Sequence, residues 1–230
     1  MMQLTVEKQQ KADNLYLILA GVFIASLVSC NLIFQKFFTW NPFGLYNFEI
    51  SVGILPYPIT FLVTDLISEI YGAKRANRVV LAGLFSSVFV LGVVTIADYS
   101  TATSWSPVSN DEFSKVFGLT TASVGASMAA YLAAQFIDIR LFHFWKRLTK
   151  GKHLWLRNNF STITSQLVDT SLVVGILCSV GAIEWQRFSE LVFAGWLFKA
   201  IIAAIDTPLL YASTWGIRKY FGLKGAEEFE

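Results

Sequence analysis

The chain carries little charge for its length. Of its 230 residues, 15% are charged and 54% are hydrophobic, whereas a soluble domain usually carries about 25% charged residues. A water-soluble globular domain is therefore excluded, and the positive mean hydropathy indicates a polytopic membrane protein. The net charge of +2 is too small to indicate a nucleic-acid-binding protein, so we expect no nucleic-acid partner.

The sequence also lacks the motifs of common enzyme and cofactor sites. It contains no glycine-rich phosphate loop, no His-Glu-x-x-His, no nucleophile elbow and no Gly-x-Gly-Asp run of intramembrane aspartyl proteases. Its two cysteines, Cys30 and Cys178, lie in apolar segments without metal-ligand spacing. We therefore expect no enzyme activity, no resident metal and no cofactor, and we interpret both cysteines as packing residues.

Six apolar segments are long enough to cross a bilayer, which takes about 20 helical residues. They cover about residues 15–38, 54–71, 78–98, 121–145, 158–181 and 190–215. Residues 48–55 could form a short interfacial or re-entrant piece before the second span. We expect residues 1–230 to form a single membrane domain, an all-α bundle of six transmembrane helices.

Lysine and arginine are unevenly distributed between the connecting segments. The N-terminal tail, second loop, fourth loop and C-terminal tail carry thirteen of them, whereas the other three loops carry one each. Cytoplasmic segments of membrane proteins are enriched in these residues. The pattern therefore predicts a multi-pass protein of the inner (cytoplasmic) membrane with both termini in the cytoplasm.

Polar side chains inside the spans are the strongest functional signal. A charge at the centre of a spanning helix costs about 3 kcal/mol on insertion scales, so a chain that carries several uses them for function. The set comprises Asp65, Glu69, Gln135, Asp138, Arg140, Gln166, Asp169, Lys199, Asp206 and, nearer a span end, Lys36.

A Gln-x-x-Asp pattern occurs in two consecutive spans, as Gln135 with Asp138 and as Gln166 with Asp169. At this spacing the carboxamide and the carboxylate project from one face of a helix. Repetition of the pattern favours a shared polar site or a duplicated unit, as is common in transporters.

The second span places Asp65 and Glu69 one helical turn apart. Like charges at this spacing repel, so we interpret the pair as a candidate proton-coupling element. The alternative is that Glu69 lies at the cytoplasmic end, pairs with Lys74 or Arg75 and only anchors the helix.

In the last span, Lys199 and Asp206 lie two turns apart on one face, about 10 Å from each other. This separation is too large for a direct ion pair. Each is therefore expected to meet a partner on another helix or a ligand, and for Lys199 a purely structural ion pair is the alternative.

Longer motifs run through the chain, namely Asn31 with Lys36, Pro58-x-Thr60-Phe61-x-x-Thr64-Asp65-x-x-x-Glu69-x-Tyr71-Gly72-x-Lys74-x-Ala76, Arg157-Asn158-Asn159-x-Ser161-Thr162-x-x-Ser165-Gln166-x-x-Asp169-Thr170, and Lys199 with Thr207-Pro208-x-x-Tyr211. With these motifs the chain resembles the queuosine precursor transporter family, from about residue 15 to residue 220.

The resemblance implies uptake of a 7-deazaguanine base, 7-cyano-7-deazaguanine or its 7-aminomethyl analogue, for queuosine modification of tRNA. The donor edge of such a base suits a carboxylate, and its carbonyl suits an amide. The substrate-binding residues that we predict are Asp65 or Asp169 for the donor edge, Gln135 and Gln166 for the carbonyl and ring nitrogens, Tyr57, Phe61 or Phe160 for stacking, Asn159 and Thr162 for the cytoplasmic approach, and Asp138, Lys199 and Asp206 within the same polar set.

Two other functions remain open at this point. One is a substrate-binding membrane subunit of an ATP-driven vitamin or nucleobase uptake system, and the other is a non-transporting scaffold or sensor. The sequence also leaves open which deazaguanine is preferred, whether transport is proton-coupled or facilitated, and whether the chain forms a homodimer.

Overall fold

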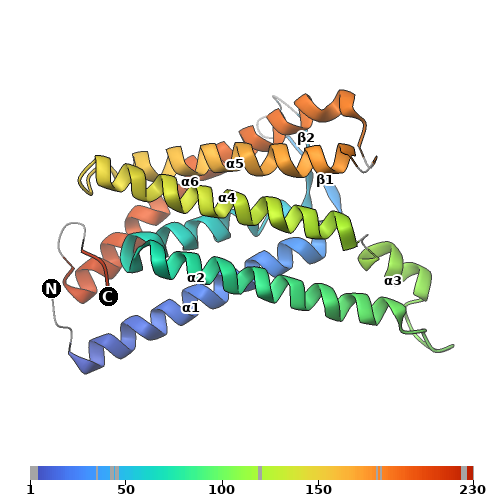
Figure 1. Cartoon of the computed structure of the whole chain (residues 1–230), viewed down its shortest axis with the longest axis horizontal. Coiled ribbons are helices and arrows are strands. Elements are labelled where there is room, and N and C mark those ends of the chain that lie inside the picture. The colour runs from blue at the N-terminus through green and yellow to red at the C-terminus, as the bar shows by residue number, and fades with distance from the viewer. Residues whose placement is uncertain are drawn as a thin grey trace.

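In the computed structural model, long helices pack into a bundle that has a small β-hairpin at one end (Figure 1). The structure describes residues 5–34, 36–41, 44, 47–118, 121–179, 181, 183–223 and 227–229, without the side chains of residues 37, 48 and 121–127. The elements are α1 (Val6–Ile33), β1 (Phe37–Trp40), β2 (Phe48–Ser51), η2 (Val52–Ile54), α2 (Tyr57–Tyr99), α3 (Asn110–Phe117), α4 (Thr121–Leu148), α5 (Leu154–Ser179), η3 (Trp185–Arg187) and α6 (Phe188–Phe221).

Helix α2 consists of two helical arms that meet at Gly72, whose φ of 78° and ψ of 167° are not helical. Figure 1 shows the chain reversing its direction there. The arms correspond to the predicted spans 54–71 and 78–98. The segment between these spans was expected to be a loop, but it is helical on the far side of Gly72.

Four helical stretches of the described chain are long and apolar enough to cross a membrane, namely 6–33, 52–99, 154–179 and 185–221. The second of them contains both arms of α2. Helix α4, with 28 residues, has the length of a span but is not one of the four. The prediction of an all-α polytopic membrane protein is thus confirmed in its coarse form.

The β-hairpin corrects the predicted end of the first span. Residues 37–38 belong to β1, which pairs antiparallel with β2 so that Phe37 faces Ser51 and Trp40 faces Phe48. Helix α1 therefore ends at Ile33 and begins at Val6, before the predicted start at residue 15. The expected piece at 48–55 is present as β2 and η2. Strand pairing is a tertiary contact that an apolar run alone does not reveal.

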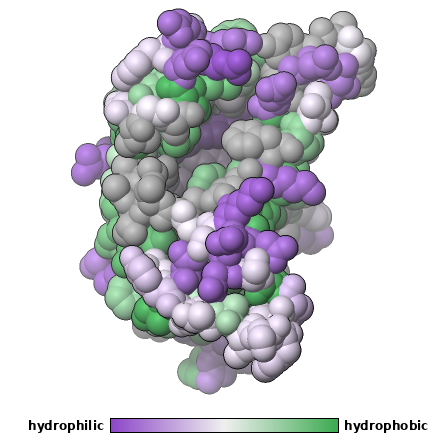
Figure 2. Space-filling view, turned by 90° about the vertical axis from the view of Figure 1, so that its right-hand side faces the viewer, coloured by the Kyte–Doolittle hydropathy of each residue, from purple (hydrophilic) through white to green (hydrophobic). Residues whose placement is uncertain are grey.

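The burial pattern differs from that of a soluble protein, although the helices also share an apolar core. Large apolar side chains such as Leu17, Phe85 and Ile205 are exposed, whereas many polar side chains are buried between the helices. Figure 2 views the hairpin end and shows hydrophilic residues gathered there. The start of α1 and the end of α6 lie together at the opposite end of the bundle, called here the terminal end (Figure 1).

Replacing Gly72 with alanine is expected to lower the free energy of unfolding by about 1–3 kcal/mol. Its positive φ lies in a region that residues with a Cβ rarely adopt, and an added Cβ would overlap the carboxylate of Glu228. Thermal unfolding in detergent measures the effect. Gly92→Ala is the matched control, because nothing lies within 4 Å of an added Cβ there. Equal melting of both variants would contradict the prediction.

Candidate functional site

A pocket, called here the cavity, lies between the first arm of α2, α5 and α6. Its apolar wall includes Phe61, Phe198 and Ile202. Its polar lining consists of Tyr57, Asp65, Asn158, Thr162, Gln166, Lys199 and Asp206. A mostly apolar cleft with a few polar groups is typical of a site for a small molecule. Seven of the residues predicted from the sequence meet here, namely Tyr57, Phe61, Asp65, Thr162, Gln166, Lys199 and Asp206.

Three of these lining side chains have buried polar atoms without a hydrogen-bond partner among the described residues. They are both carboxylate oxygens of Asp65, both amide atoms of Gln166 and the hydroxyl of Thr162. Asp65 and Gln166 are each 1% exposed. An unsatisfied buried polar group costs about 1–3 kcal/mol. Such groups persist in a cavity wall when a ligand completes their hydrogen bonds, so this part of the wall is suited to a polar ligand.

At the hairpin end of the cavity, α2, α5 and α6 are joined through Asp169. Its Oδ2 atom accepts hydrogen bonds from the Tyr57 hydroxyl at 2.5 Å and from Lys199 Nζ at 2.7 Å. Lys199 Nζ also lies 4.4 Å from the centre of the Tyr57 ring. The expectation that Lys199 meets a partner on another helix is therefore confirmed. Its charge is compensated, and its position beside the cavity is held by Asp169, by the Tyr57 ring and by the Thr170 hydroxyl, to which Nζ donates at 3.2 Å.

The Gln-x-x-Asp pair of α4 lies behind the cavity and does not line it. Ser165 donates to Asp138 at 3.0 Å, and Gln135 donates to the Tyr131 hydroxyl at 2.5 Å. The carboxyl group of Asp138 faces that of Asp65, close enough for their charges to interact. The two pairs therefore do not line one shared site. Helix α4 packs against α5 from outside, so its pair supports the residues that reach the cavity.

Asn159 and Phe160 do not reach the cavity either. Asn159 donates to the carbonyl of Trp155 and to the hydroxyl of Thr207, both at 2.8 Å. Phe160 is 49% exposed and packs against Trp145 outside the cavity. Successive helical residues point about 100° apart, so the side chain that lines the cavity is that of Asn158, which the sequence analysis did not select.

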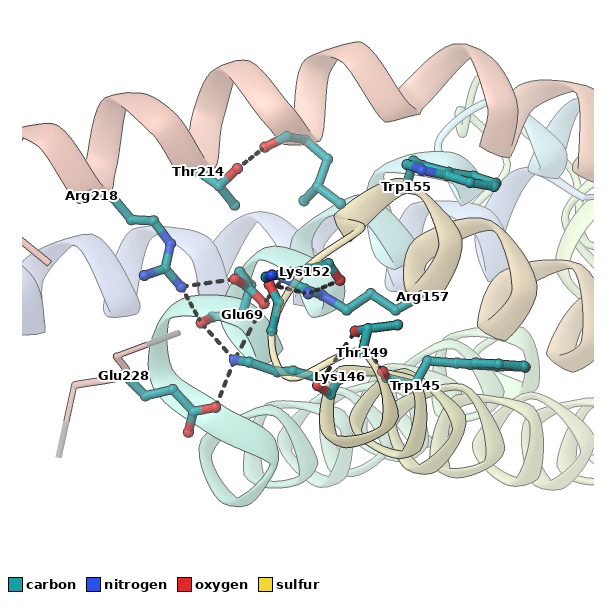
Figure 3. A network of polar contacts seen from close by, with 12 residues as sticks. Glu69, Trp145, Lys146, Thr149, Lys152, Trp155, Arg157, Thr214, Arg218 and Glu228 are labelled. Carbon is teal, nitrogen blue, oxygen red and sulfur yellow. Dashed lines mark hydrogen bonds and ion pairs between the residues drawn. The ribbon is translucent and has the colours of Figure 1, made fainter. Parts of the chain in front are cut away.

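Beyond the cavity, towards the terminal end, Glu69 is surrounded by cations (Figure 3). Its carboxylate lies 2.7 Å from Arg157, 2.8 Å from Arg218 and 3.3 Å from Lys146. Lys146 also contacts Glu228 at 2.7 Å. The network joins α2, α4, α5 and α6 to the C-terminal tail, and Glu69 follows Asp65 by one turn of α2.

This network corrects two expectations about Glu69. Its cationic partners come from other helices and are not Lys74 or Arg75. The carboxyl that faces Asp65 belongs to Asp138, because the Glu69 carboxylate is turned towards its cations. The repulsion inferred from the spacing of Asp65 and Glu69 is therefore largely compensated at Glu69. The sequence analysis used the cations that contact Glu69 only to predict which side of the membrane the loops and tails occupy.

Comparisons with known proteins give one family and three relatives. A family model described as "Putative vitamin uptake transporter" matches residues 51–213. A "Probable queuosine precursor transporter" of Bacillus subtilis (strain 168) is 26% identical over 170 residues, 74% of this chain and 73% of that protein. The "Queuosine precursor transporter" of Escherichia coli (strain K12) is 25% identical over 71% of this chain and 72% of that protein.

A third relative, a "Probable queuosine precursor transporter" of Haemophilus influenzae, is 27% identical over 75% of this chain and 69% of that protein. The resemblance stated from the sequence motifs is thus confirmed. No solved structure shows significant similarity to the chain.

Proposed function

The chain belongs to the vitamin uptake transporter family whose model it matches, and from this premise we propose that it imports a queuosine precursor, a 7-deazaguanine base. The names of the three relatives support this cargo. The observation that carries the proposal is the cavity in which Asp65, Gln166 and Thr162 have no partners among the described residues.

The lining groups complement a guanine-like base. A carboxylate such as that of Asp65 accepts two adjacent N–H donors, which are the ring N–H and the exocyclic amine of the base. The Gln166 amide can donate to the ring carbonyl and accept from a further N–H group. The rings of Tyr57 and Phe61, whose centres lie 5.4 Å apart, supply apolar surface for a flat ligand.

In the proposed arrangement, residues 1–230 form one domain that crosses the inner membrane six times, with both termini in the cytoplasm. The Glu69 network then separates the cavity from the cytoplasm. Because it connects four helices, its ion pairs must rearrange when the base leaves the cavity for the cytoplasm. If transport is proton-coupled, Asp65 and Asp138 are the pair that we propose, in place of Asp65 and Glu69.

Uptake by the purified chain in proteoliposomes tests the proposal. We expect a radiolabelled 7-deazaguanine base to accumulate to equilibrium without ATP or a partner ATPase, and guanosine, which carries a ribose, to compete weakly because of its size. Protein-free liposomes are the control. Binding without uptake would favour a subunit of an ATP-driven system, and absence of both would favour a scaffold or sensor. The mass of the purified particle tests for a homodimer.

An imposed pH gradient in the same liposomes separates coupled from facilitated transport. Coupling predicts that an acidic exterior accelerates uptake, because protons then enter with the base. Equal rates with and without the gradient would contradict coupling and leave facilitated diffusion.

A further inference from the structure

The cavity lining contains more acidic than basic residues. Its charged lining residues are Asp65, Lys199 and Asp206. Lys199 forms an ion pair with Asp169 at 2.7 Å, so its charge does not compensate Asp65 or Asp206. The cavity therefore contains two carboxyl groups and no uncommitted cation among its lining residues.

Neither carboxyl group forms an ion pair with a cation in the part of the chain that the structure describes. Both oxygens of Asp65 lack a hydrogen bond. Asp206 forms no hydrogen bond or ion pair with any described residue. Two cations beyond the cavity, Arg157 and Arg218, pair with Glu69 at 2.7 and 2.8 Å.

An unpaired carboxylate beside apolar side chains is unfavourable. Phe61, Phe198 and Ile202 line the same cavity, and the loss of water around a carboxylate is costly unless a cation or a donor replaces it. A ligand that brings a positive charge would recover this cost, whereas a neutral ligand of the same shape would not.

The two carboxyl groups differ in their surroundings. Asp65 is buried beside Thr162 and Gln166, which supply the further polar atoms that a base edge requires. Asp206 is half-buried on α6 and has no hydrogen-bond or ion-pair partner among the described residues. It is therefore suited to a single ammonium group on a short, flexible arm.

We infer that the cavity selects a cationic base, a flat guanine-like ring bearing a primary ammonium group, and that Asp206 is the counter-ion that determines this specificity. The inference rests on the proposed function for the identity of the ring. Of the two 7-deazaguanines considered above, the aminomethyl compound carries such an ammonium group at neutral pH and the cyano compound is neutral. The aminomethyl compound is thus the preferred cargo.

Binding of both compounds to the purified protein in nanodiscs tests the inference by calorimetry. We expect the aminomethyl compound to bind about 10- to 100-fold more tightly than the cyano compound, the range of a charge-assisted hydrogen bond. Asp206→Asn is expected to remove this preference by weakening the aminomethyl compound alone. Retained affinity of this variant for the cyano compound would also show that the variant is folded. Asp206→Glu should keep the preference.

Glu190→Gln is the matched control, since Glu190 is an exposed acid in the first turn of the same helix. It should change neither affinity. Equal affinity of the wild-type protein for the two compounds, or equal weakening of both by Asp206→Asn, would overturn the inference while leaving the proposed function intact. Binding of neither compound would overturn the proposed function, and this inference with it.

Discussion

Replacing Glu69 with glutamine is expected to destabilise the protein by about 3–5 kcal/mol, the usual cost of removing one partner of a buried ion pair. The carboxylate is 4% exposed and contacts three cations on α4, α5 and α6. A neutral amide leaves those cations buried with much less compensation. The substitution also weakens the ion pairs through which Glu69 connects α2 to α4, α5 and α6.

Unfolding in mixed micelles at increasing SDS concentration measures this free energy. Asp13→Asn is the control, because Asp13 is 52% exposed and lies 3.6 Å from Arg75. Exposed ion pairs usually contribute about 0–1 kcal/mol. A Glu69→Gln variant that unfolds together with the control variant would show that the network does not hold the helices together.

Replacing Gln166 with leucine is expected to weaken binding of the base about 30- to 150-fold, as two hydrogen bonds together contribute about 2–3 kcal/mol. The free energy of unfolding should not fall, because neither amide atom of Gln166 has a partner among the described residues. Leucine removes the cost of burying them without a ligand. Loss of binding with unchanged or increased stability is the signature of a residue retained for function.

Gln135→Leu provides the matched comparison on α4. Gln135 donates to Tyr131 at 2.5 Å and lies 3.5 Å from the Thr64 hydroxyl, and it does not line the cavity. We expect this variant to lose about 1–3 kcal/mol of stability, with a smaller change in affinity. Calorimetry and SDS unfolding of both variants separate the two roles. Undiminished affinity in Gln166→Leu would contradict the site that we propose.

Much of the membrane architecture was predictable from the sequence. Long apolar segments have few alternatives to spanning helices, and polar residues inside them are costly enough to indicate function. These two facts identified the helices and selected Asp65, Gln166, Lys199 and Asp206, which line the cavity. The motif residues also identified the family.

Other features depended on contacts between segments that are distant in the sequence. The Gln-x-x-Asp spacing is the same in α4 and α5, yet only α5 faces the cavity, because spacing sets the face of a helix and packing sets which way that face points. For the same reason, Asn158 lines the cavity where Asn159 was predicted to do so. Strand pairing at 37–40 likewise replaced the end of a predicted helix.

The sequence by itself determined that this protein crosses a membrane, belongs with transporters of a small base and keeps costly polar groups inside its spans, because hydropathy and residue type are local properties. Only the tertiary structure decided how those groups are paired. It assigned Lys199 to Asp169 and three distant cations to Glu69. It left Asp65 and Asp206 without a pairing cation and Gln166 without a hydrogen-bond partner among the described residues, since charge compensation depends on distances between helices that no local pattern specifies.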